Sequence, residues 1–459
     1  MKSQRRDVPH KVFLTEKEIP QAWYNLMADL PGEMLPSRNP QTKEILKPDD
    51  LAAIFPRGLI EQEMSRSAYI DIPDEVRDLY GTFRPSPLHR AYLLEDKLGT
   101  PARIYYKFEG GNTSGSHKLN SALPQAYYNK QAGIKRLSTE TGAGQWGTAL
   151  SMACALFDMA CTVYMVKISA EQKPFRKTIM ETYGSKVIAS PSNTTNAGRA
   201  VLEKDPTNSG SLGTAISEAV EDAATHDDTN YALGSVLNHV LIHQSIIGLE
   251  SQAQMASIEE YPDIVIGCCG GGSNFGGISG VYVRDKIKHG KNTRLIAIEP
   301  SACPTLTRGT FAYDYGDTIG LTPLMPQYTL GHAFLPASIH AGGLRYHGMS
   351  QIISHLYKEG IIEARAIPQT EVFNAAVQFL RTEGLLPAPE SAHAIQAGIQ
   401  EALRCKETGE EKVILICLSG HGYYDLYAYE RYNNGEIIDV DYTPDMVAEG
   451  LKCLPEIPL

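Results

Sequence analysis

The chain has 459 residues, of which 42% are hydrophobic and 21% are charged. This length exceeds what a single hydrophobic core usually fills, so two or more domains are expected in an ordinary globular protein. The formal net charge of −11 argues against binding to nucleic acid or to an anionic membrane, because those surfaces carry the same sign of charge, and it favours a small-molecule partner.

The pattern of hydrophobic residues predicts an α/β fold. The first hundred residues are interrupted by prolines and show no clear pattern. Beyond them, short β-branched or aromatic runs alternate with longer helical stretches, as in parallel sheets covered by helices. The first series of expected strands is Arg103–Phe108, Arg136–Thr139, Thr162–Val166 and Lys186–Ala189.

A second series consists of continuous apolar runs, which are typical of strands buried on both faces. These runs are Ile264–Cys268, Arg294–Ile298 and Val413–Leu418. Helical periodicity is clearest in Val240–Ser257, Thr370–Glu383 and Ser391–Arg404. Two sheets in two domains would account for both series, with the change of domain near residue 235.

A run rich in glycine and serine follows the first expected strand and opens a helix. It reads Glu109-Gly110-Gly111-Asn112-Thr113-Ser114-Gly115-Ser116-His117-Lys118-Leu119-Asn120. Its small residues let backbone N–H groups approach an anion, and a lysine in a dry pocket loses part of its charge and can form a Schiff base with a carbonyl cofactor. Taken alone, the simpler interpretation is a flexible loop with a solvated lysine.

Two further motifs stand where a strand ends and a helix begins. The backbone of Glu140-Thr141-Gly142-Ala143-Gly144-Gln145-Trp146-Gly147 can bind a carboxylate, while Glu140 adds a negative charge, although this motif alone could equally be a helix cap. The run Gly270-Gly271-Gly272-Ser273-Asn274 is typical of a phosphate cradle at a helix N-terminus. A tight turn with positive φ is the alternative, but three glycines with Ser and Asn exceed what a turn needs.

The last motif is Leu418-Ser419-Gly420-His421-Gly422, directly after the final expected strand. Ser419 offers a neutral hydrogen-bond partner for a heterocyclic nitrogen, although a serine at this place is more often a helix cap. All four motifs follow expected strands, and open α/β sheets bind ligands at the carboxyl ends of their strands. Their convergence therefore predicts one shared site.

With these residues in view, the sequence resembles the fold-type II pyridoxal-phosphate enzymes and, among them, the tryptophan synthase beta chains. The resemblance runs from Arg84-Pro85-Ser86-Pro87-Leu88 to Asp425. It implies an α/β fold of two domains, each with a mostly parallel sheet flanked by helices, and pyridoxal 5'-phosphate as cofactor. The implied division is 1–83 for an N-terminal extension and the start of the N-terminal domain, 84–117 for a segment that crosses to the C-terminal domain, 118–235 for the N-terminal domain with a mobile substrate subdomain, and 236–459 for the C-terminal domain that holds the cofactor phosphate.

The resemblance also implies a role for each matching position. Lys118 would be the Schiff-base lysine, and Glu140 would orient indole and assist its attack through C3. The implied cofactor contacts, with His117 and the glycine loop on the phosphate and Ser419 at the pyridine nitrogen, are His117, Lys118, Asn120, Gly270, Gly271, Gly272, Ser273, Asn274, Glu390 and Ser419. The implied substrate contacts are Thr141, Gly142, Ala143, Gly144, Gln145 and Arg345, and no metal site is expected.

Two positions depart from the commoner form of the family. This chain has Trp146 where that form has His, and Arg345 where it has Asp, and both residues, with an extended segment Met1–Tyr80, resemble the second, longer type of beta chain. A guanidinium pairs bidentately with phosphate, so Arg345 would favour an anionic leaving group such as that of O-phosphoserine. The alternative is an interdomain salt bridge of Arg345.

The activity that the resemblance implies is the condensation of indole with L-serine to give L-tryptophan. A serine or threonine dehydratase, or a cysteine-type synthase, is the nearest alternative, and a catalytically silent indole-binding homologue is another. Glu140 is the discriminating residue, because only a nucleophile with an N–H group needs that carboxylate. The family suggests a homodimer, leaves the alpha-chain partner open, and adds a monovalent cation as a second candidate cofactor.

The cytoplasm is the expected location. The chain has 8 scattered cysteines, and the adjacent pair Cys268-Cys269 in an apolar run is typical of buried, reduced thiols. The basic segment Met1–Lys11 is followed by charged residues rather than by the apolar core of a signal peptide. No stretch is long and apolar enough to span a bilayer.

Overall fold

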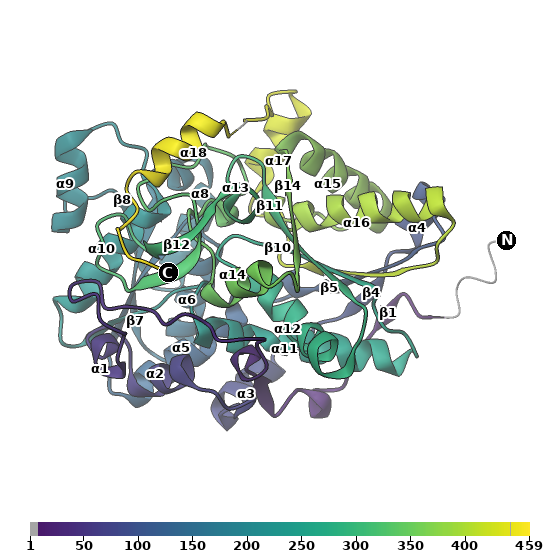
Figure 1. The fold of residues 1–459 in the computed structure, drawn as a ribbon, viewed down its shortest axis with the longest axis horizontal. Coiled ribbons are helices and arrows are strands. Elements are labelled where there is room, and N and C mark those ends of the chain that lie inside the picture. The colour runs from purple at the N-terminus through teal and green to yellow at the C-terminus, as the bar shows by residue number, and fades with distance from the viewer. Residues whose placement is uncertain (1–7, 441) are drawn as a thin grey trace.

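The computed structural model describes residues 8–440 and 442–459. Most of the basic segment Met1–Lys11 therefore lies outside the described residues. Within them, two larger sheets and two sheets of two strands each make up the β-structure, and helices surround both larger sheets (Figure 1). The α/β fold class expected from the sequence is confirmed.

The larger sheet has seven strands among the described residues, in the order β1-β4-β5-β15-β10-β11-β14. The strands from β5 to β14 run parallel to one another, whereas β4 and β1 pair antiparallel at one edge. Their bounds are β1 (Lys11–Val12), β4 (Leu88–Arg90), β5 (Arg103–Phe108), β10 (Ile264–Cys268), β11 (Arg294–Pro300), β14 (Glu363–Ile367) and β15 (Val413–Leu418).

Successive residues of the inner strands pack into two different cores. In β15, Val413 and Leu415 face one core, while Ile414 and Ile416 face the other. Because side chains alternate between the faces of a strand, this sheet is buried on both sides, as its apolar runs predicted. The helices of the first core include α11 (Asn238–Ser257) and α12 (Ser273–His289), and those of the second include α4 (Tyr92–Leu98), α15 (Gln369–Glu383) and α16 (Pro389–Thr408).

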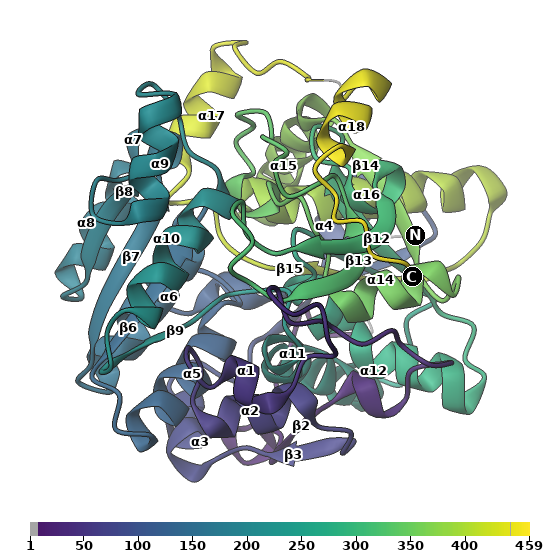
Figure 2. The same cartoon turned by 60° about the vertical axis from the view of Figure 1, so that its left-hand side comes forward.

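The smaller sheet is parallel, with the order β8-β7-β6-β9. In β7, Val163 packs into the core that contains α6, whereas Tyr164 packs into the core that contains α10. Figure 2 shows this sheet and its helices as a separate part beside the larger sheet. The bounds are β6 (Arg136–Thr141), β7 (Ala160–Val166), β8 (Lys186–Ser190), β9 (Thr229–Tyr231), α5 (Leu119–Gln131), α6 (Gln145–Leu156), α7 (Lys167–Gln172), α8 (Pro174–Thr182), α9 (Asn196–Lys204) and α10 (Leu212–Ala224).

Shorter elements complete the described chain. One two-stranded antiparallel sheet pairs β2 (Ala22–Tyr24) with β3 (Tyr69–Asp71), and the other is the hairpin of β12 (Thr310–Tyr315) and β13 (Leu324–Thr329). The remaining α-helices are α1 (Pro48–Leu51), α2 (Arg57–Met64), α3 (Asp74–Gly81), α13 (Thr305–Arg308), α14 (Gln351–Lys358), α17 (Leu426–Asn433) and α18 (Pro444–Leu451). Single 3-10 turns cover Glu16–Glu18, Leu26–Ala28, Glu109–Gly111 and Gly342–Leu344. In the described part of the chain, no helix is long and apolar enough to cross a bilayer, and no group of three or more His, Cys, Asp or Glu side chains is arranged to hold a metal ion.

Every expected strand is present, and β5, β10 and β15 have the expected bounds. Although β5 comes first in the same series as β6, β7 and β8, it lies in the larger sheet, where it pairs with β15. Strands β1 and β4 were not expected, because strands of two and three residues are too short to show alternation.

Candidate active site

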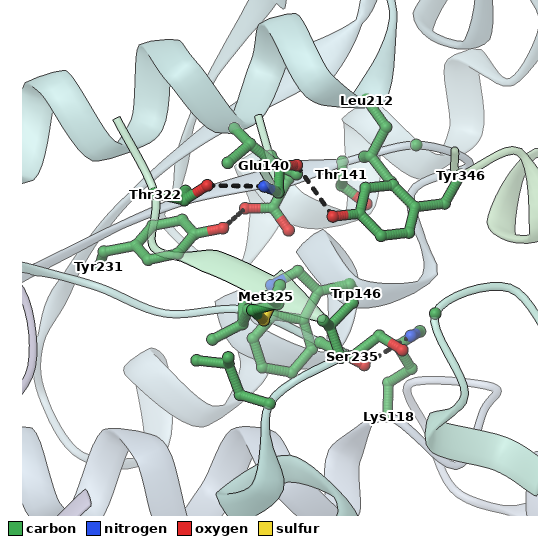
Figure 3. Close-up of a pocket in the computed structure, with 18 of the residues that line it drawn as sticks. Lys118, Glu140, Thr141, Trp146, Leu212, Tyr231, Ser235, Thr322, Met325 and Tyr346 are labelled. Carbon is green, nitrogen blue, oxygen red and sulfur yellow. Dashed lines mark hydrogen bonds between the residues drawn. The ribbon is translucent and has the colours of Figure 1, made fainter. Parts of the chain in front are cut away.

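Two adjoining cavities meet at Lys118, at the carboxyl ends of strands from both sheets. The residues that line both cavities are Lys118, Gln145, Ser235, Gly271 and Gly343. Ser419 lines the smaller cavity, whereas Glu140 and Thr141 line the larger one, which Figure 3 shows. The four motifs singled out in the sequence therefore converge on one place.

Lys118 stands directly before α5 and points its amine into the shared part of the cavities. Its Nζ donates a hydrogen bond to the carbonyl oxygen of Gly234 at 2.8 Å. Burial lowers the pKa of this amine to about 8, against the opposing charges of Glu140 and Glu390. A minor fraction of the population, about a tenth at pH 7, therefore carries a neutral, nucleophilic amine.

The loop before Lys118 packs closely on the loop after β15. The His117 N–H donates to the Ser419 carbonyl oxygen at 2.8 Å. Gly115 has φ +80, and a Cβ atom there would lie 2.6 Å from Nε2 of His421, so only glycine permits this approach. The contact brings Lys118 and Ser419 to the same cavity.

The glycine run forms a turn at the N-terminus of α12. Gly272 has φ +108 and precedes Ser273, the first residue of the helix. A Cβ atom on Gly271 would lie 2.6 Å from the side chain of Ser235, so the turn stays open only without side chains. The first N–H groups of a helix have no acceptor within that helix and carry its positive dipole end, which suits a phosphate.

Neutral and charged groups surround the smaller cavity in a way that suits a phosphorylated heterocycle. Burial lowers the pKa of His117 to about 3, so its ring is neutral, and Nε2 lies 3.2 Å from the Ser273 hydroxyl. The Ser419 hydroxyl lies 2.7 Å from that of Ser391. Glu390 accepts a hydrogen bond from the N–H of Gly343 at 2.9 Å, while its second oxygen has no partner within the described residues.

Glu140 is the penultimate residue of β6 and faces the larger cavity. Burial raises the pKa of this carboxyl to about 7, against a hydrogen bond from the Tyr231 hydroxyl, which lies 2.6 Å away. The remaining wall is largely apolar and includes side chains from the N-terminal segment, namely Leu46, Leu51, Ile54 and Phe55, together with Leu212, Ile216, Met325 and Tyr346. A proton acceptor therefore sits in a pocket suited to an aromatic molecule.

The loop after Glu140 leads into α6, with Gly144 at φ +95 as the residue before the helix. Thr141, Gly142, Ala143 and Gln145 line the larger cavity. Helix N-terminal N–H groups favour a carboxylate here. Trp146, the departure from the commoner family form, lines the same cavity and donates its Nε1–H to the Thr139 hydroxyl at 2.6 Å.

Four expected site residues, Asn120, Arg345, Gly144 and Gly272, lie outside both cavities. Asn120 is fully buried and hydrogen-bonds Arg84, Glu109 and Gln244, so its side chain serves a buried polar cluster rather than the cofactor site. Arg345 lines a small neighbouring cavity. Gly144 and Gly272 shape their turns without lining either cavity, whereas Asn274 lines the smaller one although its side chain bonds Cys268 and Cys417.

Sequence reasoning missed Tyr231, Gly234 and Ser235. Tyr231 ends the three-residue strand β9, and Gly234 and Ser235 follow it closely. They supply the partner of Glu140, the acceptor for Lys118 and a side chain against the glycine turn. A Gly-Ser pair shortly after a strand is the same signal that marked the other motifs. It was missed because so short a strand shows no periodicity.

Comparisons with known proteins agree with this geometry. The family model described as Pyridoxal-phosphate dependent enzyme matches residues 79–420. Tryptophan synthase beta chain 2 from Aquifex aeolicus is 58% identical over 432 residues, which cover 94% of this chain and 100% of that protein. The protein of the same name from Methanosarcina acetivorans is 56% identical over 428 residues, which cover 93% of this chain and 97% of that protein.

A solved structure supports the fold alone. O-acetyl serine sulfhydrylase isoform 3 from Entamoeba histolytica has a TM-score of 0.57 at 19% identity and covers 83% of this chain and 98% of its own. The relatives confirm the expected resemblance, the expected cofactor and the enzyme class, since they match nearly the whole chain. This chain belongs to the pyridoxal-phosphate dependent enzymes and, among them, to the tryptophan synthase beta chain 2 family.

Proposed function

We propose that this chain condenses indole with a serine-type amino acid to give L-tryptophan. The observation that carries the proposal is the position of Glu140, a carboxylate that titrates near neutrality in an apolar cavity shared with Lys118. A dehydratase needs the lysine and the phosphate turn, but it has no nucleophile with an N–H group to orient. The carboxylate therefore favours the synthase over the dehydratase alternative.

The residues around the smaller cavity fit pyridoxal phosphate. Lys118 would hold the aldehyde carbon, and the first turn of α12 with His117 would hold the phosphate. The neutral Ser419 hydroxyl would meet the ring nitrogen without giving it a full proton. When bound, the cofactor supplies an electron sink for negative charge at the Cα atom of an amino acid.

Lys118 then has two tasks that its lowered pKa supports. With the cofactor bound, Lys118 would release it to the amine of the incoming amino acid, and its free amine would then take the proton from Cα as a general base. The Thr141–Gln145 loop binds the carboxylate of the amino acid through backbone N–H groups, which fixes the Cα–H bond toward Lys118.

Glu140 orients the second substrate. Its carboxylate would accept a hydrogen bond from the N–H of indole and so raise the electron density at C3. The bond from C3 to Cβ replaces the bond from Cβ to the hydroxyl or phosphate oxygen, which leaves with its electron pair, and C3 gives up its proton. The apolar wall around Glu140 binds the ring and excludes water, so that water does not compete with indole for Cβ.

We further propose that Arg345 favours an amino acid with an anionic leaving group, such as O-phosphoserine. Its side chain lies in a cavity lined by Gly142, Ser169 and Ser211, next to the loop for the substrate carboxylate. Burial lowers the pKa of this guanidinium. Within the described residues its Nε has no hydrogen-bond partner, while its Nη2 donates to the Pro336 carbonyl oxygen at 3.0 Å. A buried cation in this state gains from binding an anion.

Product analysis tests both proposals. Purified protein with pyridoxal phosphate is incubated with indole and either serine or O-phosphoserine, in wild type, Lys118→Ala and Arg345→Ala. We expect tryptophan only where Lys118 is present, and a selective loss of O-phosphoserine turnover in Arg345→Ala. Pyruvate and ammonia without tryptophan would point to a dehydratase, no turnover and no cofactor absorbance band would favour a silent homologue, and an unchanged donor preference would remove the role of Arg345.

The assembly and the domain division are proposals as well. We take the chain to be a cytoplasmic homodimer, divided at residues 83, 117 and 235, on the basis of the family resemblance. The position of β4 and β5 beside β15 supports placing residues 84–117 with the C-terminal part. Light scattering of the purified protein, alone and with an alpha chain, tests the assembly, and turnover with and without potassium tests the cation.

A further inference from the structure

A buried cluster of charged side chains joins the two sheet-bearing parts of the molecule, outside both cavities. Lys173 and Arg176 lie at the start of α8, beside the smaller sheet, and Asp425 precedes α17, which follows β15 of the larger sheet. The Lys173 ammonium lies 2.5 Å from Asp425 Oδ1, and Arg176 Nη2 lies 3.5 Å from Asp425 Oδ2. The exposed fraction of these side chains is 4% or less.

Arg176 depends on the segment that carries Asp425. None of its guanidinium nitrogens has a hydrogen-bond partner in the described part of the chain. The guanidinium carbon lies 4.8 Å from the centre of the Tyr424 ring, next to Asp425 in sequence. A buried cation that loses its anion is strongly destabilised, so the charge of Asp425 and the face of Tyr424 hold Arg176 in place.

The cluster packs against two loops of the active site from outside the cavities. The stem of Arg176 packs on Gly144, where a Cβ atom would lie 2.8 Å from Arg176 Cβ. Gly144 belongs to the loop assigned to the substrate carboxylate. On the other side, Asp425 ends the segment that begins at Ser419 and contains His421, the residue that packs on Gly115 in the loop before Lys118.

We propose that Lys173, Arg176 and Asp425 are positioning residues that set the carboxylate-binding loop against the loops of Lys118 and Ser419. They line neither cavity and act through Gly144. The inference rests on the proposed function, because that function assigns the Thr141–Gln145 loop to the amino acid. Loss of the cluster therefore weakens binding of the amino acid, whereas the indole pocket around Glu140 keeps its walls.

Kinetics of the holoenzyme with Asp425→Asn and Lys173→Met test the inference. For each variant, KM is measured for the better amino-acid donor and for indole, and the dissociation constant of the donor is measured from its effect on the absorbance of the bound cofactor. Asp222→Asn is the matched control, because Asp222 pairs with Arg136 at 2.8 Å and both residues lie within the part that contains the smaller sheet.

We expect Asp425→Asn to weaken donor binding by roughly tenfold or more, with the indole KM within about twofold of wild type. Lys173→Met keeps the pair of Arg176 with Asp425 and should give a smaller change in the same direction. Asp222→Asn should lower the melting temperature without changing either constant.

Donor binding that is unchanged in both variants, or an equal rise of the donor and indole constants, would overturn the inference. If Asp425→Asn does not fold, Lys173→Met decides alone. Absence of tryptophan with the wild type would count against the proposed function instead, and the absorbance titration would still decide whether the cluster positions the donor.

Discussion

Two regions of this molecule bury the same kinds of charged residue, but only one of them pairs the opposite charges. Behind the active site, Arg84 and Lys107 meet Glu109 and Glu250 at nitrogen–oxygen distances of 2.7 to 2.9 Å, with all four side chains fully buried. At the active site, Lys118 and Glu140 line one cavity without an ion pair between them.

The difference appears in the pKa values. Burial opposes the charge on Glu109, but the Arg84 guanidinium overrides it and lowers the pKa of that carboxyl to about 2. Burial prevails at Glu140, where the pKa is about 7. In the framework, as we call the buried cluster of Arg84, Lys107, Glu109 and Glu250, oppositely charged partners stabilise the charged forms. Among the described residues, Lys118 and Glu140 have no such close partners, so these active-site groups can exchange protons near neutral pH.

Removing one anion from the framework should produce the largest effect on stability. Glu250→Ala leaves Arg84 and Lys107 with Glu109 alone, and breaking a buried pair costs about 3–5 kcal/mol in the free energy of unfolding. Urea denaturation measures the loss. Glu61→Ala, which removes an exposed partner of Arg57, should cost less than about 1 kcal/mol, and similar losses in both variants would contradict the comparison.

Converting Glu140 to an amide should damage the reaction rather than the fold. Glu140→Gln removes the acceptor for the indole N–H and should lower kcat/KM with indole by on the order of 10²-fold, roughly 3 kcal/mol, with cofactor binding retained. Glu63→Gln is the matched control, because Glu63 lines the same cavity but accepts backbone N–H groups of Asn238 and His239. Equal losses in the two variants would remove the special role of Glu140.

The same variant tests stability against pH. The folded-state pKa of Glu140 is about 7, above its ordinary value of 4.5, so the folded protein holds this proton more tightly than the unfolded chain. The resulting stability is present below pH 4.5 and is lost as pH rises through 7. Melting temperatures across this window should fall less steeply in Glu140→Gln than in wild type.

The sequence predicted the residues of the active site far better than those of the framework. The active-site motifs were predictable because each is a local run of small residues after a strand, which is visible in sequence order. The framework cluster was not, because Glu250 lies in the middle of α11 and meets Arg84 only through the tertiary fold. Asn120 shows the limit, since it is the last residue of the first motif and yet its side chain hydrogen-bonds Arg84 and Glu109 and lines neither cavity.

The partner of Glu140 escaped prediction for the same reason. Tyr231 is 91 residues away in sequence and ends a strand of three residues, so neither periodicity nor a motif marks it. The apolar wall from Leu46 to Phe55 was equally hidden, because the proline-rich segment that supplies it shows no regular pattern.

The smallest effect should come from Tyr231→Phe. This change removes the hydrogen bond that lowers the pKa of Glu140, so the Glu140 carboxylate loses a stabilising partner and differs still more from the paired carboxylates of the framework. That pKa should then rise, and the acidic limb of the pH profile of tryptophan formation should move to higher pH by up to about one unit. Tyr346→Phe is the matched control, because Tyr346 lines the same cavity but donates its hydroxyl to Gly316. If both variants moved the limb equally, the shift would reflect general loss of polarity in the pocket rather than the partner of Glu140.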